Sequence, residues 1–471
     1  MRLTSTLFCG FALLSASPPV IFSPGAHAQQ QAETPASRVM LAWLAAFNSG
    51  DDAQFKVFDE TYKPTRSMSK MRDFRNQVGG FTLARIEKNE ATAVTALLKE
   101  KGSDNVVRME MTVTADDPPK MVGARLQLIP PPADLAPARL AEADAMAAIV
   151  KEVDAAARDD QFSGVVLIAR NGKVIMEKAW GQADRASKVP VALDTQFRIG
   201  SMNKMFTSVA ILQLIDAGKL SLDDTVGKRL PDYPNKDVAG KVTIRHLLTH
   251  TGGTGDIFGP EFDKQRLTLK THADYLKLYG ERAPGYEPGA QSRYSNYGFV
   301  LLGAIIEKIS GMSYYDYVQK NIFQPAGMTA TASLPENEKV AKRSMGYMKE
   351  GGKWVANTDT LPWRGTSAGG GYSTAGDLLR FAEALQSGKL VSKPLLAEAT
   401  RNQADRYGFG FGVRADGKWQ SYGHGGGAPG MNGELRIIPQ QGYVLVALSN
   451  LDPPAASRVL DFVGNRLPGS D

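Results

Sequence analysis

The residues "RIGSMNKMFTSVAILQLIDAGKL" (198–220) set the architecture of most of this chain. After Ser201 the stretch is apolar on nearly every side, which is typical of a buried helix, and Gly218 is a natural stop at its C-terminal end. Ser201 should therefore lie at the helix N-terminus. Lys204, three residues later, shares its face. A helix buried all round needs a sheet and other helices packed against it, so the flanking sequence should supply them.

Ser201 and Lys204 carry the chemistry that this placement suggests. Burial disfavours the ammonium form and lowers the lysine pKa, and a neutral lysine can accept the proton of a serine nucleophile. The backbone N–H groups at the helix N-terminus can stabilise a developing oxyanion. The alternative is an N-cap serine with a surface lysine. The same S-x-x-K spacing occurs at Ser67 and Lys70, within the polar stretch "SMSKMRDFRN", and there we expect no site.

A second element is "RYSNYGFVLLGAIIEKISG" (293–311), in which Tyr294 and Asn296 precede an apolar helix. A phenol beside a lysine ammonium should have a lowered pKa and could relay protons, while an asparagine amide could orient a substrate carbonyl and bond to the lysine. The alternative is a loop tyrosine followed by an N-cap asparagine. A second Tyr-x-Asn, at Tyr233 and Asn235, is typical of a plain turn.

A third element is "YGHGGGAPGMNGELRI" (422–437), where glycines would let a strand edge approach a ligand closely. The backbone N–H of Gly427 could complete an oxyanion hole with that of Ser201. His424, Gly425 and Gly426 would then border the substrate. The alternative is a glycine-rich hairpin with an incidental histidine.

Strand patterns flank this helix at a distance on both sides. In "FSGVVLIARNGKVIMEKAWG" (162–181) two apolar runs meet at Asn171-Gly172, which predicts a hairpin. Strands return in "WQSYGHGG", "GELRIIP" and "GYVLVALSN", followed by an amphipathic stretch at 455–466. The residues between are mostly helical. We expect an α/β (α+β) fold: an antiparallel sheet, built from both ends of the unit and flanked by helices, with an inserted all-helical lobe.

A smaller α+β unit is expected ahead of it, at 34–129. Helical patterns come first, and then Val107, Met109, Met111 and Val113 alternate with polar residues, as in a half-buried strand. The stretch 122–128 alternates in the same way. A Pro/Ala-rich linker at 130–138 separates this unit from the larger domain at 139–468.

The first 28 residues have the layout of a cleaved secretory signal, with Arg2, an apolar stretch and "AHA" ending at Ala28. The apolar run is too short for a membrane span, so we expect a periplasmic or secreted protein without one. Cys9 is the only cysteine, so the mature chain would have neither disulfides nor thiolate metal ligands. The net charge of +6 comes without basic runs, which argues against nucleic-acid binding.

The three elements occur together with other segments typical of one family. "LLTHTGG" (247–253), "YEPGAQSRYSNYGFVLLGAIIEKISG" (286–311), "IFQPAGMTAT" (322–331), "SAGGGYSTAGDLLRF" (367–381) and "YGFGFGV" (407–413) complete the set. From about 145 to 465 the chain resembles the class C β-lactamase-related serine hydrolases, which include β-lactamases, D-Ala-D-Ala peptidases, amidases and esterases. His246 and His250 are spaced like metal ligands, but His250 falls inside a family segment, so we expect packing or capping roles for both.

This resemblance implies a mechanism that needs no metal or cofactor. Ser201 would form an acyl-enzyme with a small-molecule or short-peptide acyl substrate, Lys204 and Tyr294 would move protons, and Asn296 would orient the substrate. The N–H groups of Ser201 and Gly427 would form the oxyanion hole. An exported hydrolase of esters or amides is therefore expected. The alternatives are a β-lactamase or D-Ala-D-Ala carboxypeptidase proper, or a catalytically idle ligand-binding protein.

One departure from the family concerns the third element. Class C β-lactamases carry Lys-Thr-Gly where this chain has His424, Gly425 and Gly426. A histidine with a pKa of about 6.5 is mostly neutral at pH 7 and should hold a substrate carboxylate more weakly than a lysine. The N-terminal unit, through "LAAFNSGDDAQFKVF" (44–58), resembles cone-shaped domains of the polyketide cyclase and nuclear transport factor type, which implies ligand binding or a homodimer.

Overall fold

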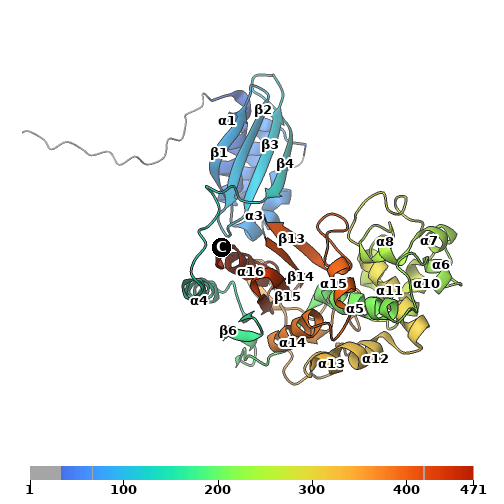
Figure 1. Cartoon of the computed structure of the whole chain (residues 1–471). Helices are drawn as coiled ribbons and strands as arrows, with labels where there is room; N and C mark the ends of the chain where they lie inside the picture. The colour runs from blue at the N-terminus through green and yellow to red at the C-terminus, as the bar shows by residue number, and fades with distance from the viewer. Residues whose placement is uncertain (1–32, 66, 417–418, 470–471) are drawn as a thin grey trace, which may run out of the picture.

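The computed structural model describes residues 33–65, 67–416 and 419–469. These residues form a mixed α/β structure with antiparallel sheets and helices, which confirms the expected fold class. Two sheets dominate: one of four strands near the N-terminus and one of six strands in the larger part of the chain (Figure 1). The segment read as a secretory signal, 1–28, lies outside the described residues.

The N-terminal sheet has the strand order β1-β2-β3-β4, with every neighbouring pair antiparallel. In β3, Val107, Met109, Met111 and Val113 are all buried, so the alternation seen in the sequence does mark one packed face. The elements of this part are α1 (Pro35–Ser49), α2 (Asp52–Tyr62), α3 (Arg72–Val78), β1 (Phe81–Asn89), β2 (Ala93–Glu100), β3 (Val106–Val113) and β4 (Met121–Ile129).

The six-stranded sheet has the order β13-β14-β15-β16-β5-β6 and draws its strands from distant parts of the sequence. Asn171 and Gly172 both have positive φ and make the predicted tight turn between β5 and β6. The strands are β5 (Gly164–Arg170), β6 (Lys173–Trp180), β13 (Gly412–Asp416), β14 (Trp419–Ala428), β15 (Met431–Ile438) and β16 (Tyr443–Ser449).

The central strands of this sheet are apolar on both faces, because helices cover both. In β5, Val165 and Leu167 face the cluster that contains α5 (Asn203–Asp216) and α14 (Ala375–Gln386), while Val166 and Ile168 face the opposite cluster. That second cluster is made with α4 (Glu142–Arg158) and α16 (Ala455–Arg466). Successive side chains of a strand point to opposite faces, so a continuous apolar run is what a sheet between two helical layers requires.

A helical lobe is inserted between β6 and β13 (Figure 1, green to orange). Its helices beyond α5 and α14 are α6 (Val226–Arg229), α7 (Lys236–Lys241), α8 (Ile244–Leu248), α9 (Pro260–Gln265), α10 (His272–Tyr279), α11 (Asn296–Ser310), α12 (Tyr314–Val318), α13 (Gln324–Ala326) and α15 (Lys393–Ala399). Short strand pairs accompany them: β7 (Gln182–Asp184) with β8 (Val189–Pro190), β9 (Phe197–Arg198) with β12 (Tyr372–Ser373), and β10 (Tyr347–Glu350) with β11 (Lys353–Ala356).

Helix α5 lies at the junction of the sheet and the helical lobe. Eleven of its fourteen residues are buried, as its uniformly apolar sequence predicts. It packs against α11 and α12 on the lobe side and against β14 on the sheet side. The first residues of α5 are therefore held between two layers, and a polar side chain there is removed from water.

An ion pair joins the N-terminal part to the larger part. Arg466, at the end of α16, donates to both carboxylate oxygens of Asp104 in the loop between β2 and β3. Figure 1 shows the blue N-terminal sheet beside this helix. Among the described residues, no helix is both long enough and apolar enough to cross a membrane.

Candidate active site

Ser201 lies in a single 3₁₀ turn, Gly200–Met202, that leads directly into α5. Gly200 has a φ of 50°, a conformation that an L side chain rarely adopts, and so the turn depends on glycine there. The Lys204 ammonium nitrogen Nζ lies 3.3 Å from Ser201 Oγ. The side chain of Lys204 is fully buried, and that burial lowers its pKa to about 7. The structure thus confirms the lowered lysine pKa inferred from the sequence.

Three further groups surround the Lys204 amine. Nζ donates to Asn296 Oδ1 at 2.7 Å and to the backbone carbonyl of Ala368. It also lies over the ring of Tyr294, 4.6 Å from the ring centroid. The two carbonyl acceptors and the aromatic ring fix the orientation of the Lys204 amine. Its remaining hydrogen-bonding position therefore faces Ser201.

Asp256 extends this arrangement, although no motif in the sequence points to it. Asn296 Nδ2 donates to both of its carboxylate oxygens, at 3.0 and 3.2 Å, which leaves Asn296 Oδ1 for Lys204. The negative charge of Asp256 raises the Lys204 pKa, against the larger effect of burial. The N-cap of α11 is Ser295, whose hydroxyl accepts from Gly298 N, so the alternative of an N-cap at Asn296 is wrong.

The Tyr294 hydroxyl lies near enough to Ser201 for the serine to lower the tyrosine pKa, and Lys204 bonds to the same serine. The expectation of a lowered tyrosine pKa is wrong. Although Tyr294 is 43% exposed, the dense surroundings of its hydroxyl raise its pKa above the usual value, and the Asp256 charge adds to that. At neutral pH Tyr294 is therefore a neutral phenol and a hydrogen-bond donor.

The edge of β14 packs directly against the turn that carries Ser201. A Cβ atom on Gly426 would lie 2.0 Å from the carbonyl oxygen of Ile199 and 3.1 Å from the backbone nitrogen of Ser201. A Cβ atom on Gly200 would lie 3.4 Å from the backbone nitrogen of Gly427. Only glycine permits this approach, and it brings the main chains at Ser201 and Gly427 close together.

His424 is buried on β14 in one defined tautomer. Its Nδ1 lies beside the carbonyl of Gly425, which can only accept, so Nδ1 carries the proton and Nε2 accepts from the Tyr407 hydroxyl at 2.8 Å. Burial, with a contribution from Lys204, lowers the His424 pKa to about 3. The third element therefore presents a neutral histidine where the related enzymes have a lysine.

The other histidines of the sequence analysis have packing and capping contacts. His250 is buried against the rings of Tyr294 and Tyr407, and its Nδ1 accepts from Ser295 N at 3.1 Å. His246 accepts from Thr243 N in the capping box of α8. In the described parts of the chain, no three His, Cys, Asp or Glu side chains come together in a way that could hold a metal ion.

The duplicate motifs lie elsewhere, in ordinary structural roles. Ser67 caps a short 3₁₀ helix and donates to Asp59, while Lys70 is exposed. Asn235 caps α7 and Tyr233 bonds to Tyr297. Neither copy resembles the buried cluster around Ser201.

A sheet lies between helical layers, with half-buried Ser201 and buried Lys204 at its junction with a helical lobe, and this arrangement is that of a serine hydrolase. The family model described as Beta-lactamase matches residues 145–467, more than half of the chain. The chain belongs to the β-lactamase family. The matched range excludes the four-stranded sheet near the N-terminus.

Individual relatives support the assignment of the chain to this family. The chain is 32% identical over 317 residues to penicillin-binding protein 4* of Bacillus subtilis (strain 168), covering 62% of this chain and 68% of the relative. The crystal structure of a penicillin binding protein from Bacillus halodurans is 30% identical, with a TM-score of 0.61, over 66% of this chain and 98% of that one. A D-stereospecific amidohydrolase from Streptomyces sp. is 29% identical, with a TM-score of 0.57, over 67% and 97%.

Proposed function

We propose that this serine hydrolase forms an acyl-enzyme on Ser201 and hydrolyses ester or amide substrates. The observation that carries the proposal is the fully buried Lys204, with its pKa lowered to about 7, 3.3 Å from the Ser201 hydroxyl. A surface lysine would keep its proton at neutral pH. A lysine poised near neutrality can act as a general base.

The steps follow from the positions of the groups. Neutral Lys204 takes the Ser201 proton as Oγ attacks the substrate carbonyl carbon, and the N–H groups of Ser201 and Gly427 stabilise the oxyanion. The C–O or C–N bond then breaks, and Lys204 returns the Ser201 proton to the leaving group, either directly or through the neutral phenol of Tyr294, which passes on one proton as it receives another. Water then attacks the acyl-enzyme and gives a proton to neutral Lys204, the bond between the acyl carbon and Ser201 Oγ breaks, and Lys204 returns the proton to Oγ as the acid is released. Asn296, already bonded to Lys204, orients the substrate with an Nδ2 N–H that it shares with Asp256.

The substrate class follows from the electrostatics of the site. Among the described residues, His424 on β14 is neutral and Asp256 places a carboxylate beside Asn296, so the position of the class C lysine carries no fixed positive charge to hold a substrate carboxylate. We expect esters and amides without a required carboxylate to be preferred. Faster hydrolysis of cephalosporins than of simple acyl esters would contradict this.

Two other functions compete with this one. Relatives named as penicillin-binding proteins favour a β-lactamase or D-Ala-D-Ala carboxypeptidase, which would form penicilloyl adducts. A catalytically idle ligand-binding protein would have no need of a buried lysine beside the serine. Burying an amine costs free energy that an idle protein has no reason to retain.

The test is the intact mass of the purified protein after brief mixing with p-nitrophenyl butyrate and, separately, with a penicillin. A butyryl adduct on Ser201 without a penicilloyl adduct supports the proposal. A penicilloyl adduct supports the cell-wall alternative. Absence of both adducts on folded protein favours the idle binder.

Activity should depend on pH through Lys204. The base must be neutral, so kcat/KM should rise as pH increases through about 7, where Lys204 loses its proton. Because the Tyr294 pKa is raised, ionisation of Tyr294 should not change kcat/KM at pH values below that pKa. Stopped assays with an uncharged ester from pH 5 to 9 measure the profile. A flat profile across pH 7 would contradict a lysine base.

Substituting Asp256→Asn should move this acid limb to lower pH. The carboxylate stabilises the Lys204 ammonium, so removing its charge lowers the lysine pKa further. The Asn296 amide also loses its charged acceptor, which should reduce kcat. The matched control is Asp274→Asn, because Asp274 is also half-buried and accepts from backbone N–H groups, at the start of α10. An unshifted limb in Asp256→Asn would contradict the coupling.

The leader at 1–28 would direct export, with cleavage near Ala28, so that the mature enzyme works in the periplasm or outside the cell. The N-terminal sheet and helices, 34–129, would act as a separate unit joined by the 130–138 linker and able to form a homodimer. Mass spectrometry of secreted protein tests the cleavage, and the mass in solution tests the dimer.

A further inference from the structure

The loop 366–371 runs along the whole turn that carries Ser201. Ile199 N donates to Gly371 O at 3.2 Å, and Gly370 N donates to Gly200 O at 3.1 Å. A few residues earlier in the loop, the carbonyl of Ala368 accepts from Lys204. The loop therefore acts as a backbone template for the serine and the lysine together.

Three consecutive carbonyls of this loop point into the first turns of α5. Asn203 Nδ2 donates to Thr366 O and Thr207 Oγ1 donates to Ser367 O, both at 2.7 Å, while Lys204 takes the carbonyl of Ala368. The three carbonyls can accept from these three donors together only if the loop keeps one conformation. We therefore expect other residues to fix the loop on the side that faces away from α5.

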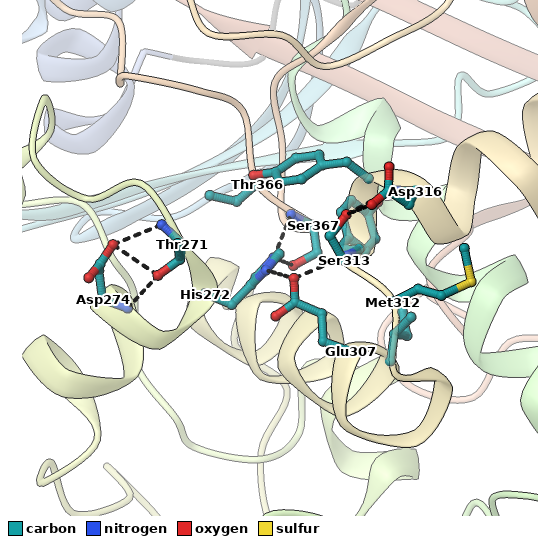
Figure 2. A network of polar contacts seen from close by, with 12 residues as sticks. Thr271, His272, Asp274, Glu307, Met312, Ser313, Asp316, Thr366 and Ser367 are labelled. Carbon is teal, nitrogen blue, oxygen red and sulfur yellow. Dashed lines mark hydrogen bonds and ion pairs between the residues drawn. The ribbon is translucent and has the colours of Figure 1, made fainter.

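The side chain of Ser367 provides that hold. Its Oγ donates to the Phe299 carbonyl of α11 at 2.8 Å and lies 2.8 Å from His272 Nε2. His272 Nδ1 lies 3.1 Å from Glu307 Oε1. Figure 2 shows His272 between the Glu307 carboxylate and Ser367, with α10, α11 and the loop each contributing one member.

These three side chains have the spacing of a serine–histidine–carboxylate triad but not its accessibility. Ser367 is 0% and His272 1% exposed, so no substrate can reach the hydroxyl. Glu307 also accepts from Tyr314 N at 3.0 Å, and the Tyr314 hydroxyl bonds to Thr207 of α5. The network therefore also contacts α5, the helix that carries Lys204. This arrangement indicates a structural role, in which the network supports the active site.

We propose that Glu307, His272 and Ser367 are positioning residues that fix the 366–368 carbonyls and thereby aim the Lys204 amine at Ser201. The inference rests on the proposed function for its effect on turnover. Loss of the Ser367 contacts would let the Ala368 carbonyl move away from Lys204 Nζ. The base would then be misaligned while the surface that binds substrate is unchanged, so kcat should fall and KM should stay the same.

Ser367→Ala tests this, with Ser163→Ala as the matched control. Ser163 is also almost fully buried, and its hydroxyl donates to Gln182 O and accepts from Gln182 N, without contact to the 366–371 loop or α5. Both variants should lose some thermal stability. Only Ser367→Ala should lower kcat, by roughly 10- to 100-fold for a displaced catalytic group. Equal kcat in the two variants would overturn the inference.

A second readout does not depend on turnover. The Ala368 carbonyl stabilises the charged form of Lys204, so releasing it should lower the lysine pKa, seen by NMR of ¹³Cε-labelled lysine. A wild-type protein that no ester acylates would contradict the proposed function, whereas this titration would still decide the positioning role. An unchanged Lys204 titration in the variant would overturn that role.

Glu307→Gln is the second variant if Ser367→Ala fails to fold. The Glu307 side chain is 32% exposed, so the change is milder and keeps the size of the group. Glu307→Gln should lower both kcat and the Lys204 pKa, as Ser367→Ala should. Wild-type values for both quantities would contradict the network as a whole.

Discussion

Ser201→Ala should abolish acyl-enzyme formation and reduce ester hydrolysis by roughly 10⁵- to 10⁶-fold, the usual consequence of removing a nucleophile that acts as a unit with its base. The fold should persist. Ser201 is only half-buried, and Lys204 keeps its bonds to Asn296 and Ala368 without the hydroxyl. Intact-mass analysis with p-nitrophenyl butyrate, alongside circular dichroism and thermal unfolding, separates lost chemistry from lost structure.

Ser67→Ala is the matched control, since Ser67 belongs to the second S-x-x-K of the chain. That serine caps a short 3₁₀ helix and bonds to Asp59 in the N-terminal part. Its removal should cost about 1 kcal/mol of stability, as for other helix caps, and leave hydrolysis unchanged. Persistent butyrylation in Ser201→Ala would place the nucleophile at another residue.

Gly426→Ala should have the second largest effect, through the contact of β14 with the Ser201 turn. The new Cβ atom would lie 2.0 Å from Ile199 O. Ile199 is fully buried and bonded to Gly371, so its backbone cannot move away cheaply. The strand edge must retreat instead, which separates the two proposed oxyanion donors. We expect roughly a 10²- to 10³-fold loss in kcat and about 1–3 kcal/mol of destabilisation from overpacking.

Gly412→Ala, on the neighbouring strand β13, is the control in the same sheet. Its Cβ atom would lie 3.6 Å from Gly423 O, an ordinary contact, and the position is half-buried. Activity and stability should change little, within about 0.5 kcal/mol. Steady-state kinetics and thermal unfolding of both variants measure the difference. Equal activity would mean that the Gly426 approach does not shape the site.

Local pattern predicted the elements of the fold that depend on nearby residues. The hairpin at Asn171-Gly172, the half-buried strand at 107–113 and the buried α5 all follow from turn chemistry or periodicity, and the structure has each of them. The final amphipathic stretch forms α16 over 455–466, as its pattern indicated. The sequence pattern did not indicate strands β1 and β2.

The parts of the site that the sequence did not predict come from loops. Asp256 reaches Asn296, and Ala368 reaches Lys204, from segments far away in sequence, and their polar contacts leave no periodic signal. The Tyr294 pKa was predicted in the wrong direction because the sequence gives no local solvation. The lysine faces the tyrosine ring, and desolvation of the hydroxyl outweighs any effect of a nearby positive charge.

The antiparallel pairing of β5 with β16 has a consequence for the order of folding. Ser449 Oγ donates to Ser163 O across 286 positions, so the first strand of the larger sheet waits for the last. Until then α5 lacks part of the sheet that covers it, and its apolar surface is available to chaperones or to aggregation. Such non-local closure slows folding. The large sheet therefore closes only when its final strand, β16, has joined it.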